Sequence, residues 1–105
     1  MSVDYRAIYG YGFHISNEEV DALPEELHDD FIDSIYTICT DCIYENVGYF
    51  FGLNLCTAEP SYMFALPAVD NYDHKDFIAM IKEFKKYFPH RDAMKIKHYL
   101  INQVC

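Results

Sequence analysis

The sequence has no lysine or arginine between Arg6 and Lys75, although 13 carboxylates lie in that stretch. A protein that binds nucleic acid directly normally presents a basic field, so we expect no direct nucleic-acid partner. No apolar run approaches the roughly 18 residues that a membrane-spanning helix needs, so we expect no membrane partner. The first residues lack the basic flank and apolar segment of a secretory signal, which favours a cytoplasmic protein.

The common catalytic and cofactor motifs are also missing. There is no P-loop, Gly-x-Ser-x-Gly or HExxH, and Gly10-Tyr-Gly12 lacks the third glycine of a dinucleotide fingerprint. The histidines stand singly, and the carboxylates do not follow the order of ligands in an EF-hand. Cys39 and Cys42 match Cys-x-x-Cys, but they lie well inside an expected helix and lack further ligands at zinc spacing. We therefore expect packed core thiols, no metal, no cofactor and no enzymatic activity.

What the sequence does contain is enough apolar material for a folded core. Apolar residues make up 51% of the 105 residues, which excludes a disordered chain. Ten tyrosines and eight phenylalanines supply large rings for a core, and tyrosine also suits interfaces because its hydroxyl can stay in water. The length is typical of one domain, so we expect a single domain over residues 1–105.

Alternation of apolar and polar residues with a period of two predicts the strands. It is clearest over residues 3–15 and 47–56, and a shorter run suggests a third strand over 62–66. Gly10 and Gly12 share one face of the first strand, where bare backbone admits a closely packed helix or a partner.

Helical spacing predicts two helices. Ser16 and Glu19 have capping-box spacing for a short turn, and a longer helix begins at Pro24 and ends near residues 46–48. Its expected apolar stripe consists of Leu27, Phe31, Ile35, Ile38 and Cys42. A second helix runs from about residue 73 to Phe88.

The tail, residues 94–105, fits a helix or a strand, and we favour a strand because the other strands need a partner. The resulting order, β-α-β-β-α-β, predicts an α+β fold of the ferredoxin-like type. In that arrangement two helices pack on one face of an antiparallel sheet.

The first long helix is expected to carry a row of carboxylates opposite its apolar stripe. Carboxylates three or four positions apart on a helix lie about 5–6 Å from each other, and such a row complements a surface lined by lysine and arginine. The alternative is a solvated face that only keeps the protein soluble. The expected partner-binding residues are the row Glu26, Asp29, Asp30 and Asp33, the flanks Glu18, Glu19, Asp21 and Glu25, and the aromatic anchors Tyr9 and Tyr11 on the open face of the sheet.

These features together resemble a known group of proteins. A short acidic chain with Tyr9-Gly-Tyr-Gly12, a carboxylate-rich segment and Tyr49-Phe-Phe-Gly52 resembles small bacteriophage-encoded accessory proteins, among them anti-CRISPR and anti-restriction inhibitors. The resemblance implies a non-enzymatic inhibitor that occupies the nucleic-acid groove of a host defence nuclease, in the cytoplasm of the host cell. The basic tail departs from the pattern, because strong mimics of nucleic acid are acidic throughout.

Two other functions remain open. The basic C-terminal segment contains Lys82, Lys85, Lys86, Arg91, Lys95 and Lys97. It could pair with the acidic segment of another copy in a homodimer or larger homo-oligomer, and exposed edge strands would favour the same outcome. An enzyme acting on a small ligand between sheet and helices is the third alternative.

Overall fold

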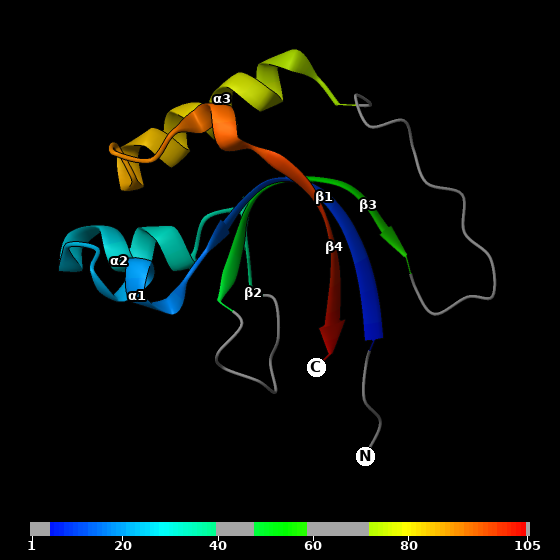
Figure 1. Cartoon of the computed structure of the whole chain (residues 1–105), viewed down its shortest axis with the longest axis horizontal. Helices are drawn as coiled ribbons and strands as arrows, with labels where there is room; N and C mark the ends of the chain where they lie inside the picture. The colour runs from blue at the N-terminus through cyan, green and yellow to red at the C-terminus, as the bar shows by residue number, and fades with distance from the viewer. Residues whose placement is uncertain (1–4, 40–47, 59–71, 105) are drawn as a thin grey trace.

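The chain folds into an α+β structure built on a four-stranded antiparallel sheet (Figure 1). The computed structural model describes residues 5–39, 48–58 and 72–104. Its elements in chain order are β1 (Tyr5–Ile15), α1 (Asn17–Asp21), α2 (Glu25–Ile32), β2 (Thr37–Cys39), β3 (Tyr49–Ala58), α3 (His74–Tyr87), the 3-10 helix η1 (Ala93–Lys95) and β4 (Lys97–Val104). The strands lie in the order β2-β3-β1-β4, so β1 and β3 are central.

The strands predicted at the start, middle and end of the chain are confirmed, each with shifted ends. β1 covers the described part of the first prediction, and β3 begins and ends two residues later than expected. The tail forms strand β4, after η1 has taken up residues 93–95. The strand predicted over residues 62–66 lies outside the described residues.

The long helix predicted from Pro24 is wrong beyond Ile32. α2 ends there, and the chain turns to form β2, the edge strand beside β3. The Thr37 hydroxyl donates a hydrogen bond of 2.6 Å to the backbone carbonyl of Phe31, which satisfies a group that a longer helix would have paired. The β-branched residues that follow the turn favour a strand. The remainder of the predicted helix, residues 40–47, lies outside the described residues.

This turn redistributes the apolar stripe expected on the long helix. Phe31 is fully buried and Leu27 packs against the same core, as the helical spacing predicts. Ile35 lies in the turn with 88% of its surface exposed. Ile38, in β2, packs with Phe50 in a separate cluster on the other face of the sheet. Of the stripe residues that the structure describes, only those within α2 therefore face the main core; Cys42 lies outside the described residues.

The predicted helix starts are confirmed in two places. At α1, the Ser16 hydroxyl accepts the Glu19 N–H at 3.2 Å, and the Glu19 carboxylate accepts the Ser16 N–H at 3.2 Å. At α3, the Asp73 carboxylate accepts the Lys75 N–H at 2.7 Å. These side chains satisfy backbone donors that have no partner inside the helix. Pro24 immediately precedes α2 and is not its first helical residue.

The main core lies between the sheet and the three helices, which are grouped on one side of a strongly bent sheet (Figure 1). Phe13 of β1 stacks on Phe84 of α3 with a centroid distance of 3.8 Å. Phe31 of α2 stacks on Phe51 of β3 at 5.8 Å. All four rings are at most 1% exposed, so α2 and α3 are each fixed in rotation by an aromatic side chain inserted into the core.

On the opposite face, the ring of Phe50 fills the space left by three glycines. A Cβ built on Gly10, Gly12 or Gly52 would lie 2.6, 3.0 or 2.9 Å from the Cζ atom of that ring. Gly12 and Gly52 face each other across β1 and β3, and a Cβ on either would lie within 2.6 Å of the other's Cα. The bare patch predicted at Gly10 and Gly12 is therefore covered by Phe50. Partly or fully buried neighbours complete this small cluster: Ile8, Ile38, Tyr99 and Ile101.

Candidate functional site

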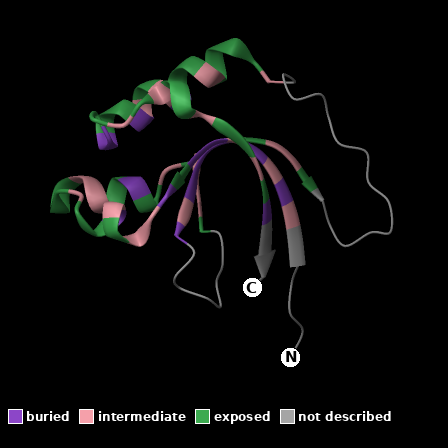
Figure 2. Ribbon diagram, in the orientation of Figure 1, coloured by how far each residue is buried: buried purple, intermediate pink, exposed green. Residues whose placement is uncertain are grey.

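The eight carboxylates of the expected partner-binding face all lie on α1, α2 and the residues that end these helices. We call this set the acidic surface: Glu18, Glu19, Asp21, Glu25, Glu26, Asp29, Asp30 and Asp33. α1 and α2 lie together at one end of the sheet (Figure 1). Glu19 is half-buried and the other seven are exposed (Figure 2). The structure thus brings the predicted charged residues together on one part of the molecule.

The rotation of α2 decides which way its carboxylates point. Phe31 is fully buried, so the side of α2 that carries it faces the core. At about 100° per residue, the five carboxylates from Glu25 to Asp33 fall within an arc of about 140° on another side of the helix. All five are exposed. The predicted contact row therefore exists on the surface, even though the helix that carries it is much shorter than predicted.

Two members of the acidic surface are paired with cations of the same chain. The Arg91 guanidinium lies 2.5 Å from the Glu19 carboxylate, and the Lys86 ammonium lies 3.8 Å from that of Asp30. Among the described residues, no other carboxylate of the acidic surface has a lysine or arginine partner. The basic C-terminal segment thus neutralises the edge of the acidic surface and leaves most of it open.

Glu19 has a lowered pKa in the folded protein. Burial would by itself raise the pKa of this carboxyl. The N–H of Ser16 and the Arg91 guanidinium act in the opposite direction, and the resulting pKa lies below the ordinary value. The carboxylate is therefore the stable form, and Glu19 serves both as a cap of α1 and as the anion of the pair with Arg91.

The expected aromatic anchors, Tyr9 and Tyr11, do not lie on the open face of the sheet. Both are half-buried on the face that carries Phe13 and the helices. Tyr11 stacks on His98 of β4 at 4.2 Å and on Phe77 of α3 at 5.9 Å. Tyr9 stacks on the same histidine at 5.8 Å. These rings are engaged in packing between β1, β4 and α3, and none of these ring contacts involves α2.

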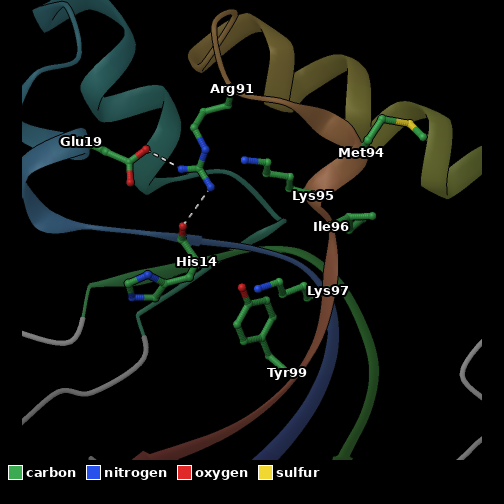
Figure 3. A pocket seen from close by; sticks show the side chains of 8 residues that line it. All are labelled: His14, Glu19, Arg91, Met94, Lys95, Ile96, Lys97 and Tyr99. Carbon is green, nitrogen blue, oxygen red and sulfur yellow. Dashed lines mark hydrogen bonds and ion pairs between the residues drawn. The ribbon is translucent and has the colours of Figure 1, made fainter.

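A second charged feature lies where α1, the end of β1 and the start of β4 meet. We call it the basic hollow; it is open to solvent and has a volume of about 600 Å³. Its polar lining residues are His14, Glu19, Arg91, Lys95, Lys97 and Tyr99. Figure 3 shows the Lys95 and Lys97 side chains extending from one side of the hollow and His14 and Glu19 lying on the other. Three cations face one carboxylate, which makes this a local positive site on a chain of net charge −9.

The basic hollow follows from strand geometry. Ile96 is extended, so Lys95 and Lys97 extend to the same side, and Tyr99 follows on that face of β4. Opposite Lys97 and Tyr99 in β1 lie Gly12 and Gly10, and the ring of Phe50 covers both glycines. The sequence analysis identified the basic segment but missed the hollow. One feature of the sequence could have indicated the hollow. Lys95, Lys97 and Tyr99 alternate with a period of two in the predicted C-terminal strand, and the first predicted strand contains glycines on one face.

Cys39 does not follow the prediction of a packed core thiol. Cys39 is exposed at the end of β2, and Cys56 is half-buried in β3. Cys39 also lies in a strand, whereas the analysis placed it inside a helix. Cys42 and Cys105 lie outside the described residues. Within the described part of the chain, no group of three or more His, Cys, Asp or Glu residues could hold a metal ion.

Comparisons with known proteins leave this chain without an identified relative. No protein-family model matches it, and neither the curated proteins nor the solved structures contain a significant match. Among the described helices, none is both long and apolar enough to cross a membrane.

Proposed function

We propose that this protein is a non-enzymatic binding protein whose acidic surface docks on a lysine- and arginine-lined site of a partner protein. The observation that carries the proposal is the exposed arc of five carboxylates on α2, only one of which pairs with a lysine of the described residues. Such an arc complements a basic groove and would speed association with it. The cytoplasm is the proposed location.

The position of three of these carboxylates at the end of α2 supports a role other than stability. Asp29 and Asp30 lie in the last turn of the helix and Asp33 ends it, while no basic residue occupies that turn. The C-terminus of a helix carries partial negative charge, so acidic side chains there are unfavourable by roughly 0.3–1 kcal/mol each. The fold keeps these residues in spite of their effect on stability. Residues that are unfavourable for stability are typical of binding surfaces.

As the class of partner we propose an enzyme that binds nucleic acid, such as a defence nuclease of a bacteriophage host. The lysines and arginines that bind phosphates in its groove are the cations that the acidic surface would contact. The chain would then act as an inhibitor by competition. Occupation of the groove requires no catalytic group on this protein.

The test is capture of host proteins on the immobilised chain, followed by competition with double-stranded DNA. The chain is compared with a triple variant in which Glu26→Gln, Asp29→Asn and Asp33→Asn remove exposed charges that have no lysine or arginine partner among the described residues. Asp76→Asn removes an exposed carboxylate of α3 outside the acidic surface and is the control for loss of negative charge elsewhere on the chain.

The expected result is retention of nucleic-acid enzymes that DNA and salt displace, with loss of retention in the triple variant. Addition of the chain to a captured nuclease should slow cleavage of its substrate. Equal retention by the chain and the triple variant would overturn the proposal. Retention that DNA does not displace would overturn the competitive mechanism.

A second candidate is self-association between the acidic surface of one copy and the basic segment of another. The observation in its favour is that Lys95 and Lys97 are exposed and have no ion-pair partner among the described residues. Sedimentation at low and high salt tests it, since a dimer held by these charges should dissociate as salt increases.

For the fold, we propose a variant of the ferredoxin-like arrangement. Support comes from β3, which lies between β1 and β2 and is antiparallel to both, while β4 flanks β1. Two short helices and a short β2 replace the single long helix and full strand of the ordinary arrangement. Amide proton contacts between neighbouring strands, measured by NMR, test this topology; a different strand order would exclude it.

A further inference from the structure

The basic hollow contains hydrogen-bond donors that do not pair with the carboxylates of the acidic surface. Lys95 and Lys97 are exposed, and neither side chain has a hydrogen-bond or ion-pair partner among the described residues. Tyr99 is half-buried beneath them, with its ring edge-on to Phe50 at 6.0 Å. In Figure 3 the Lys97 ammonium and the Tyr99 hydroxyl point into the lower part of the space, and the Lys95 ammonium points into its upper part, toward Arg91. We propose that this part of the hollow binds a small phosphate-bearing anion.

The opposite end of the hollow explains where the anion would lie. Arg91 donates to the Glu19 carboxylate through Nη1 and to the His14 carbonyl through Nη2 at 3.4 Å. Its charge is therefore already balanced by an internal carboxylate. Repulsion by Glu19 and attraction by Lys95 and Lys97 both place the ligand at the β4 end of the hollow. The pair shows that the hollow can hold an anionic group. The negative charge of Glu19 repels a second anion from that end of the hollow.

The donor set favours a phosphate group over a simple carboxylate. A phosphate oxyanion has several acceptor oxygens and accepts bonds from two ammonium groups and a hydroxyl together. The volume of about 600 Å³ is typical of sites for small molecules and much larger than one carboxylate. Long polyanions are disfavoured, because they would extend beyond the hollow to the acidic parts of a chain whose net charge is −9, whereas a small ligand stays within the local positive site.

The floor of the site is preformed. Phe50 is 1% exposed, covers Gly10 and Gly12 of β1, and supports the ring of Tyr99. The lysines themselves are flexible and solvated, so we expect binding at high micromolar to millimolar concentrations. Such an affinity fits a site that binds mainly the phosphate group, with further contacts to the rest of the ligand.

The test is titration of the labelled protein with pyrophosphate, inorganic phosphate and glycerol phosphate, followed by amide NMR shifts. The test variant is Lys95→Gln with Lys97→Gln. The matched control is Lys75→Gln with Lys82→Gln, which removes two exposed lysines from α3 and gives the same net charge. Circular dichroism of both variants establishes that the fold is kept.

We expect saturable shifts at residues 95–99 and at His14, with affinity reduced at least about tenfold in the test variant and less than about twofold in the control. The ranking of the three probes distinguishes free phosphate from a phosphate ester or a diphosphate. Equal affinity in the two variants, shifts elsewhere, or no saturation would overturn the proposal. The same amides shifting with protein concentration alone would also overturn it, because the hollow would then hold the acidic surface of another copy.

Discussion

The Arg91 guanidinium and the Glu19 carboxylate, 2.5 Å apart, join the loop after α3 to the first helix. Glu19 belongs to the acidic surface and Arg91 to the basic hollow, so the pair marks the boundary between the two charged sites. The same carboxylate also accepts the Ser16 N–H at the start of α1. One side chain therefore fixes the helix start and the adjacent wall of the hollow.

Glu19→Gln should destabilise the protein at neutral pH by about 0.5–1 kcal/mol, the size of a partly exposed ion pair. Glutamine still accepts the Ser16 N–H, so the capping box survives and the loss reports on Arg91. Because the pKa of Glu19 is lowered in the folded state, its contribution is fully present above the ordinary glutamate pKa. The contribution disappears as pH falls through the folded pKa. Urea denaturation at neutral and strongly acidic pH measures the difference.

Glu18→Gln is the control for this prediction, since Glu18 is an exposed neighbour on α1. It should change the free energy of unfolding little at either pH. A gap between the Glu19 variant and the parent that persists unchanged in acid would contradict the ion-pair explanation.

Gly12→Ala should cost several kcal/mol or prevent folding, whereas Gly10→Ala should cost about 1–3 kcal/mol. A Cβ on Gly12 would lie 2.2 Å from the backbone oxygen of Phe51, which cannot move without breaking the sheet. A Cβ on Gly10 meets only the ring of Phe50. Phe50→Leu should therefore partly rescue Gly10→Ala but leave Gly12→Ala uncorrected. A double-mutant cycle followed by urea denaturation measures the coupling, and additive effects at Gly10 would disprove the contact.

Ile35→Ser should change stability by less than about 0.5 kcal/mol, while Phe31→Ala should cost about 3–5 kcal/mol. Ile35 is 88% exposed in the turn after α2, and Phe31 is fully buried. In the long helix indicated by the sequence, both side chains would face the core and both changes would be costly. The comparison of their unfolding midpoints thus tests where α2 ends.

Asp29→Lys should stabilise the protein by about 0.5–1 kcal/mol at low salt. It removes a carboxylate from a crowded acidic arc and places a cation in the last turn of α2, where the helix carries partial negative charge. Thermal unfolding at low and high salt measures the effect, which should shrink as salt screens the charges. A destabilised variant would show that Asp29 has a structural partner. A stabilised variant that no longer binds the partner would show that Asp29 acts in binding and is not needed for the fold.

Local patterns in the sequence determined the three long strands, the start of α1, the α3 helix and the clustering of acidic charge. Period-two alternation, capping side chains and the gap in lysine and arginine depend only on neighbours in the chain, so they are readable before folding. The spacing of Phe31 also gave the correct buried side of α2.

Tertiary structure decided what these patterns could not. Helical spacing alone would have continued α2 through Ile38, but the exposed edge of β3 offered that segment strand hydrogen bonds, and β2 formed instead. The basic hollow exists because β4 pairs with β1 in a register that sets Lys97 opposite Gly12. A register joins residues far apart in the sequence, and its energy comes from contacts made only when the sheet is assembled.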